Sequence, residues 1–517
     1  MKSRPKKILL LLLVAVLLVA AGLVQKNINR DRDALGLTIS QPLQDAPPVL
    51  AMTTQALGGF RGLISNFLWM RANDLQINDQ YFEAAQLANW ITDLEPHYTQ
   101  VWCYQGWNMA YNISVKFTDP ADRWRWVKNG IELLRDRGLR YNPDDMLIYR
   151  ELAWFFQHKM GANLDDANMY YKTQWAIEMT PFFGPRGTNF DALINPRTAE
   201  DRTNVFVLKD KYKIDPVFAQ KVNTEWGPLD WRLPEPHAIY WGSLALEKAK
   251  EHPDKVTHGD IITDRRIIYQ SMMQDFQHGQ LIDNPFNHTA ELGPNLAIIP
   301  KVNDAYETMM REDPGDAHNI AIGHRNFLLD ATYYLYEANR VDEAQKWYEQ
   351  VRRQYPDKTI MQNDVNSFPK NVPLDIYCVY RVQGDVKDTS KEDTTAAIKG
   401  LLIRSYIYLA IGEDDRYAGF RLLAIKVWKN YMDKMRSYKS DLARVGLPPF
   451  KSIDNEVLSE MLDPVNGLPY AARLVIRTQL HLPGDPNQPY GVISTNTVPL
   501  IGTPASTNAP VSSRNPQ

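Results

Sequence analysis

The sequence predicts an all-α chain, an α-solenoid of helical-hairpin repeats with long loop insertions, preceded by one N-terminal transmembrane helix. Apolar residues recur at helical spacing through most of the 517 residues. Segments of about 34 residues share one pattern of small and apolar positions. An uncharged apolar run, Ile8 to Val24, follows a cluster of basic residues. No strand-like alternation lasts long enough to predict a sheet.

The composition is that of a folded globular protein and excludes several functional classes. Hydrophobic residues make up 44% of the chain and charged residues 23%, both close to globular averages. The net charge of -3 provides no basic footprint for nucleic acid. Two cysteines are too few for a disulfide framework or a cysteine-based metal cluster. We expect Cys103 and Cys378 to be buried thiols, with one bridge between them as the alternative.

The N-terminal apolar run predicts a route across a membrane. At about 1.5 Å per residue, Ile8 to Val24 is at the short end of what spans a bilayer as a helix. The basic residues between Lys2 and Lys7 favour a cytoplasmic N-terminus. We interpret residues 1–25 as an uncleaved anchor. A signal peptide cleaved after the small residue Ala21 is the alternative. Both interpretations carry the rest of the chain across the membrane.

Composition and periodicity divide the remaining chain into five segments. Within the central segment, the pairs Asn195-Pro196 and Asp215-Pro216 each predict a capped helix start. The stretch from Asp283 to His288 contains an Asn-Pro pair and predicts a turn. The predicted segments are a stalk (26–52), N-terminal helical repeats (53–181), a loop-rich insertion with a helical pair (182–317), C-terminal helical repeats (318–482) and a disordered tail (483–517).

Two segments show the repeat pattern clearly, and they are Arg325 to Pro356 and Ser65 to Pro96. In each, small residues let the two helices approach closely, and the terminal proline ends the second helix. In the first segment the patterned positions are Leu328, Ala331, Thr332, Leu335, Ala344, Tyr348 and Val351. In the second they are Leu68, Ala72, Leu75, Ala84, Ala88 and Ile91.

This pattern resembles the tetratricopeptide repeat (TPR) family over about 65–350, with degenerate helical pairs beyond. The stretch "LGGFRGLISNFLWMRANDLQ" followed by "LEPHYTQVWCYQGWNMAYN" also resembles a group of bacterial membrane-anchored repeat proteins of unassigned function. The resemblance implies a single-pass protein of the bacterial inner membrane with most of its chain in the periplasm. It implies no activity. The insertions 182–236, 281–317 and 356–394 depart from a regular array.

A search for chemical motifs predicts no enzyme, no cofactor and no metal. The chain has no HExxH zinc motif, no GxxxxGK[ST] phosphate loop and no GxSxG nucleophile elbow. The acidic pairs Asp144-Asp145, Asp165-Asp166 and Asp414-Asp415 stand at predicted helix starts, where carboxylates favour the helix dipole. We therefore interpret them as caps.

Tryptophan is concentrated in the N-terminal half, where all but two of the 13 precede residue 242. Most stand at helical spacing and are expected to fill gaps between stacked helices. Trp124 and Trp126 are two residues apart and cannot share one face of a helix. The triplet Trp124, Arg125 and Trp126 is therefore a candidate surface contact.

The resulting hypothesis is a non-catalytic, membrane-tethered scaffold that binds protein partners through a helical groove, with no nucleic acid and no metal. The alternative is an envelope enzyme or polysaccharide-binding subunit with an aromatic-lined cleft and acids such as Asp283 or Asp313. Besides the tryptophan triplet, the candidate partner-binding residues are Asn66, Met70, Asn73, Tyr104, Asn108, Arg150 and Arg325.

Overall fold

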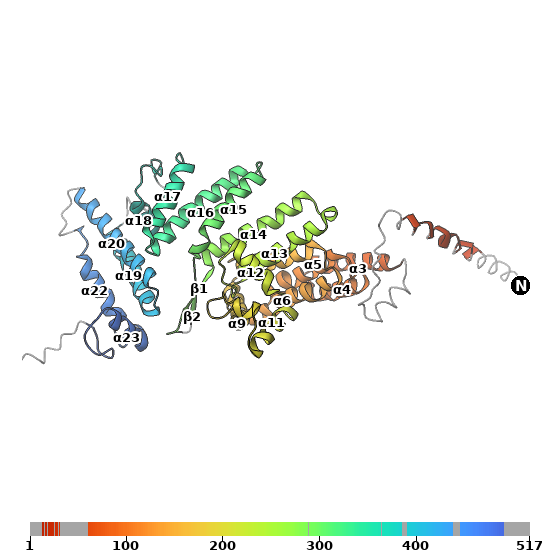
Figure 1. Cartoon of the computed structure of the whole chain (residues 1–517), viewed down its shortest axis with the longest axis horizontal. Coiled ribbons are helices and arrows are strands. Elements are labelled where there is room, and N and C mark those ends of the chain that lie inside the picture. Colours follow the sequence, from red (N-terminus) through yellow and green to blue (C-terminus); the bar gives the residue numbers. More distant parts are fainter. Residues whose placement is uncertain are drawn as a thin grey trace, which may run out of the picture. The chain divides into compact units, whose positions relative to one another are not determined.

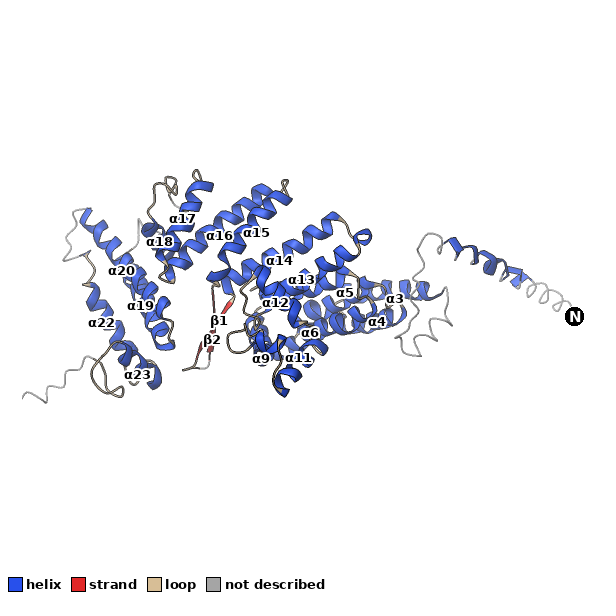
Figure 2. Ribbon diagram, in the orientation of Figure 1, coloured by secondary structure: helices blue, strands red, loops and turns tan. Residues whose placement is uncertain are grey.

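In the computed structural model the chain is overwhelmingly helical, and the predicted all-α class is confirmed (Figure 2). The chain forms two compact units, Met1–Ile113 and Ser114–Gln517, which are taken separately below. The structure describes residues 60–287, 289–362, 364–384, 390–437 and 445–490, with short runs between 13 and 31.

Of the predicted membrane anchor the structure describes only short helical runs between residues 13 and 24, and most of the stalk and the tail beyond residue 490 lie outside the described residues. Within the part of the chain that the structure describes, no helix is both long and apolar enough to cross a membrane. The anchor at Ile8 to Val24 therefore stays a prediction.

The first unit contains the hairpin α3 (Phe60–Ile77) and α4 (Tyr81–Leu94), followed by α5 (Thr99–Trp107) and a π-helical segment, η1 (Asn108–Ile113). Helix α4 packs against both α3 and α5. Ala72, Ala84 and Ala88 are fully buried at this packing. Small residues at predicted positions thus line the place where the helices meet.

The second unit begins with a series of short helices that pack on one another and on a long hairpin (Figure 1). The hairpin is α13 (Pro234–Glu251) with α14 (His258–His278), and α8 packs against both of its helices. Preceding elements are η2 (Ser114–Lys116), α6 (Pro120–Glu132), η3 (Leu133–Gly138), α7 (Leu139–Tyr141), α8 (Met146–Trp154), η4 (Phe155–Gly161), α9 (Asn168–Phe183), α10 (Asp191–Ile194), α11 (Ala199–Asp210) and α12 (Pro216–Trp226). A short η5 (Pro253–Lys255) joins α13 to α14.

One of the two predicted proline helix starts is confirmed, and the other is wrong. Asp215 caps α12 by accepting from the N–H groups of the next turn. Asn195 instead follows the end of α10, and α11 begins only at Ala199. Thr198 and Asp201 form a reciprocal capping box there, which satisfies two otherwise unpaired N–H groups and sets the start of the helix.

A β-hairpin that the sequence did not predict follows α14. Strand β1 (Gln280–Asn284) pairs antiparallel with β2 (Thr289–Gly293), with Gln280 opposite Gly293. The predicted turn at Asp283 to His288 is confirmed in part, because Asp283 and Asn284 end β1 and the turn occupies residues 285–287.

The rest of the second unit consists of successive helices with two more hairpins, α16 with α17 and α19 with α20 (Figure 1). Ala331, Ala344 and Tyr348, all part of the repeat pattern, are fully buried. The elements are η6 (Leu296–Ile298), α15 (Ile299–Glu312), α16 (Ala317–Glu337), α17 (Val341–Gln354), α18 (Leu374–Gln383), α19 (Lys391–Ile411), α20 (Asp414–Ser437), α22 (Phe450–Met461) and α23 (Tyr470–Gln479).

Three hairpins, α3–α4, α16–α17 and α19–α20, reverse the chain through the same turn. Asp79, Asn339 and Gly412 adopt left-handed backbone there, with φ of 58°, 58° and 83°. In each turn the next residue donates its N–H to the carbonyl five residues earlier, over 2.8, 2.8 and 2.9 Å. Asn, Asp and Gly are the residues that adopt this conformation most easily.

A buried histidine joins α15, α16 and α17. His324 Nε2 lies 2.9 Å from Asn303 Oδ1, and His324 Nδ1 lies 2.9 Å from the Tyr355 hydroxyl. This arrangement suits a neutral ring that donates through Nε2 and accepts through Nδ1. Burial lowers the pKa of His324 to about 4.

Acidification is predicted to loosen this junction. Because the folded pKa of about 4 lies below the usual 6.5, the unfolded chain binds the proton more readily as pH falls from 6.5 toward 4. We expect the shifted pKa of His324 to lower the free energy of unfolding by about 2 kcal/mol at pH 5 relative to neutral pH. Thermal unfolding at pH 7 and pH 5 should show a smaller pH effect in His324→Gln than in wild type. The exposed-site control His318→Gln should keep the full effect, and an equal loss in all three proteins would contradict the assignment.

Candidate functional site

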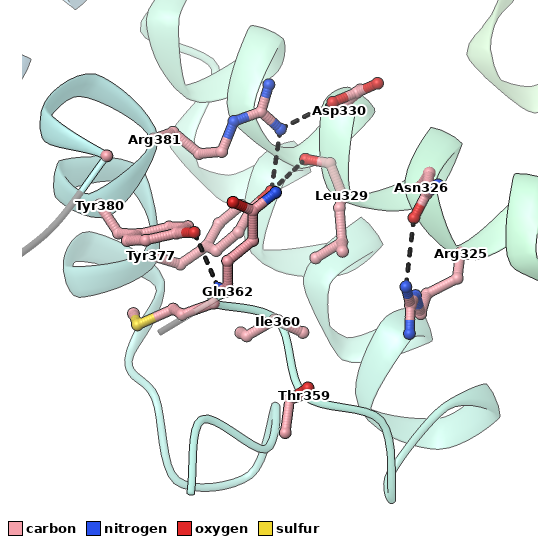
Figure 3. A pocket seen from close by; sticks show the side chains of 12 residues that line it. Arg325, Asn326, Leu329, Asp330, Thr359, Ile360, Gln362, Tyr377, Tyr380 and Arg381 are labelled. Atoms are coloured by element: carbon pink, nitrogen blue, oxygen red, sulfur yellow. Dashed lines mark hydrogen bonds and ion pairs between the residues drawn. The ribbon is translucent and has the colours of Figure 1, made fainter. Parts of the chain in front are cut away.

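A pocket of about 620 Å³ lies between α16, α18 and the segment that follows α17 (Figure 3). Helix α16 contributes one face and α18 the facing wall. The lining residues are Arg325, Asn326, Leu329, Asp330, Thr359, Ile360, Met361, Gln362, Tyr377, Tyr380, Arg381 and Gly384.

The wall between the two helices is built on an ion pair. Arg381 Nη1 lies 2.6 Å from Asp330 Oδ1 and donates to the Tyr377 hydroxyl over 3.1 Å. The Tyr377 hydroxyl in turn donates to the carbonyl of Leu329 over 3.2 Å. Burial raises the pKa of Tyr377, so this hydroxyl remains a donor at physiological pH. The wall is therefore held by a continuous chain of polar contacts.

The segment after α17 covers part of the pocket. The Gln362 N–H donates to the Tyr380 hydroxyl over 2.9 Å, as Figure 3 shows. Ser367 holds the same segment, because its carbonyl accepts from the Ile360 N–H and its Oγ accepts from the Met361 N–H. Thus part of the predicted 356–394 insertion closes over the face of α16.

Arg325 gives the pocket an uncompensated positive charge. Its Nη2 approaches Asn326 Oδ1 at 3.4 Å, and its Nε is buried without a hydrogen-bond partner among the described residues. Within the same residues it forms no ion pair with a carboxylate, whereas Asp330 is neutralised by Arg381. A guanidinium in this state is suited to bind a carboxylate or another planar anion.

The candidate residues of the first unit occupy different environments. Asn66, Met70 and Asn73 lie on the exposed face of α3, where Met70 is 63% exposed. Tyr104 is half-buried and donates to Gln76 Oε1 over 2.7 Å. Asn108 is fully buried, so its side chain is not presented on a surface.

The tryptophan triplet is divided between the core and the surface, as its spacing requires. Trp124 is buried and stacks on Tyr171, with ring centroids 5.9 Å apart. Trp126 is half-buried and stacks on Phe117. Arg125 is exposed and pairs with Asp122 over 3.0 Å.

Arg150 has a structural partner in place of a free surface. Its Nε lies 2.7 Å from Asp264 and its Nη2 3.1 Å from Asp260, so it bridges α8 to α14. Of the ten candidate residues, Arg325 is the one on the pocket wall. Tyr377, Tyr380 and Arg381 escaped prediction because the whole of 356–394 was interpreted as an insertion. Their helical spacing in "LDIYCVYR" was the available signal.

One group of potential metal ligands already has a cation from the protein. Asp144, Glu251 and His252 bring ligand atoms within 4.8 Å of one another. The Lys248 ammonium donates to Asp144 over 3.3 Å and to Glu251 over 2.7 Å. It therefore supplies the positive charge that these carboxylates require.

The two acids of the alternative hypothesis each lie beside an arginine. Asp283 is on β1, 3.6 Å from Arg232 Nη1. Asp313 follows α15 and pairs with Arg266. Asp313 thus takes part in an ion pair with α14, whereas the Asp283 side chain is 64% exposed.

Comparison with models of protein families, with curated proteins and with solved structures found no match to this chain.

Removing the Tyr380 hydroxyl is predicted to release the segment that covers the pocket. Tyr380→Phe takes away the acceptor of the Gln362 N–H, a hydrogen bond worth about 1 kcal/mol. Hydrogen exchange of residues 359–362 should then become several-fold faster while α16 is unchanged. Tyr470→Phe, at an exposed position of α23, is the matched control. Unchanged exchange in Tyr380→Phe would show that this bond does not hold the segment.

Proposed function

We propose that the chain is a non-catalytic TPR-type scaffold, tethered to a bacterial inner membrane, that binds a protein partner on the periplasmic side. The observation that carries the proposal is the pocket between α16 and α18, with the uncompensated charge of Arg325 on its wall. The tether and the compartment follow from the basic and apolar residues of 1–25 and from the family resemblance.

The repeat assignment has support from the shared construction of the hairpins. The turns at Asp79 and Asn339 each place one residue in the left-handed conformation at the same position, and they form the same hydrogen bonds. The second helix of both hairpins ends on a residue that precedes proline, at φ/ψ of -126°/63° for Glu95 and -130°/48° for Tyr355. Both hairpins thus match the helix–turn–helix unit closed by a proline that is typical of a TPR.

The pocket has the chemistry to hold an extended peptide segment with an acidic side chain. In a TPR array the first helices of successive repeats line the binding groove. Helix α16 is the first helix of its hairpin, and α18 is the next helix along the chain. Arg325 would bind the carboxylate, while Leu329 and Tyr380 provide apolar and aromatic contact. The covering segment 359–362 would restrict how the peptide enters.

Photo-crosslinking in living bacteria tests this proposal with the full-length chain. A photoreactive residue at Asn326, on the pocket wall, is expected to capture a discrete protein partner. Arg325→Glu should abolish the adduct, because reversing the charge weakens a pair with a carboxylate at least about tenfold. Arg353→Glu, an equal charge change at an exposed site on α17, should leave it intact.

Two results would contradict the proposal. Adducts of equal yield in wild type and Arg325→Glu would show that the charge plays no part in partner binding. Capture of a glycan instead of a protein would favour the polysaccharide-binding alternative.

A further inference from the structure

A second group of polar side chains is buried between α9, η4, α13 and α14, apart from the pocket. Lys172, Glu235 and Asp275 are 2%, 1% and 0% exposed. Gln274 accompanies them on α14. Fully buried charged residues are rare unless they are paired or bind an ion.

Four oxygen acceptors of this group have no hydrogen-bond donor among the described residues. They are both carboxylate oxygens of Glu235, Oε1 of Gln274 and Oδ1 of Asp275. The second oxygen of Asp275 is satisfied, because Asn295 Nδ2 donates to it over 2.7 Å. Each unsatisfied buried acceptor costs about 1–3 kcal/mol. A set of four therefore calls for a ligand that contributes positive charge.

Two of these oxygens converge on Gly161, the last residue of the π-helical turn η4. A Cβ on Gly161 would stand 3.0 Å from Gln274 Oε1, 3.0 Å from the carbonyl oxygen of Phe156 and 3.4 Å from Glu235 Oε1. The glycine is not needed for a left-handed backbone, since it is absent from the positive-φ residues. A side chain there would press on these oxygens, so the close approach of the oxygens to one point explains the glycine. Single π-helical turns are frequent at functional sites.

The nearby charges leave an excess of negative charge if both carboxyls are ionised. Lys172 donates to Asn163 Oδ1 over 3.1 Å and is the cation that acts on Glu235. Asp230 is neutralised by Arg232, 2.6 Å away. Burial lowers the pKa of His237 to about 4 and also lowers that of His278, so neither ring adds charge near neutral pH.

Burial favours the neutral form of all three charged groups. It raises the pKa of Glu235 and that of Asp275, and it lowers the pKa of Lys172. The carboxyls can therefore be neutralised in two ways, by a proton or by a metal ion. The convergence of several oxygens beside Gly161 favours the metal ion, because one cation can contact all of them whereas a proton on one carboxyl leaves the other acceptors unsatisfied.

We propose that Glu235, Gln274 and Asp275 form a buried oxygen site for a hard divalent cation of the Ca²⁺ or Mg²⁺ class. Carboxylate and amide oxygens are the ligands that these ions prefer. The site connects α13 to α14 beside η4, so the bound ion stabilises this part of the second unit. The site is independent of the peptide-binding proposal for the α16–α18 pocket.

Metal content and thermal unfolding of the full-length purified chain test the site. The protein is stripped with a chelator, dialysed, and given Ca²⁺ or Mg²⁺ separately, with K⁺ as a control for ionic strength. We expect one divalent ion per chain after gel filtration and a rise in the unfolding midpoint. Glu235→Gln should weaken ion binding at least tenfold. Glu200 is the second residue of α11, as Glu235 is of α13, but it is exposed. Glu200→Gln should therefore bind the ion like wild type.

Gly161→Ala keeps every oxygen that would bind the ion and places a methyl group beside these oxygens. It should reduce ion binding even if Glu235→Gln fails to fold. The proposal is overturned if neither divalent ion is retained and neither raises the midpoint. It is also overturned if Glu235→Gln is more stable than wild type at every ion concentration, since the carboxyls then hold a proton.

Discussion

The left-handed turn residue between paired helices is the constraint on which the architecture depends. At Asp79, Asn339 and Gly412 the chain reverses within two or three residues, and the hydrogen bonds of the turn align the second helix antiparallel to the first. Small residues such as Ala331 and Ala344 then let the helices approach closely. Helix α17 packs against α16, and the part of α16 that carries Arg325 forms the pocket together with α18 and the segment after α17.

Prolines determine where the helices stop, and one of these stops creates the pocket. Six helices end on a residue before proline with ψ between 48° and 75°, a conformation that the following ring favours over the helical one. After most of them the next helix begins within a few residues. After Tyr355 the chain instead takes a longer path through 359–362 to α18 and covers the groove. A departure from the regular repeat thus turns an open surface into a partly covered pocket.

The sequence predicted what local patterns determine and missed what only folding brings together. Small-residue spacing located the hairpins α3–α4 and α16–α17, because packing depends directly on those side chains. The β-hairpin escaped prediction because its five-residue strands carry little β-pattern and pack on α14. Glu235 and Asp275 lie on different helices, and only the α13–α14 packing buries them. The same applies to the pocket, of which Arg325 alone was predicted.

Hydrogen exchange of α16 and α17 in two variants of Asn339 tests the central claim most directly. Valine strongly disfavours the left-handed backbone, at a cost of about 1–2 kcal/mol, whereas glycine adopts it freely. We predict that Asn339→Val speeds exchange of both helices about tenfold and that Asn339→Gly leaves it unchanged or slower. Equal exchange in the two variants would contradict the account, because the turn would not then determine the hairpin.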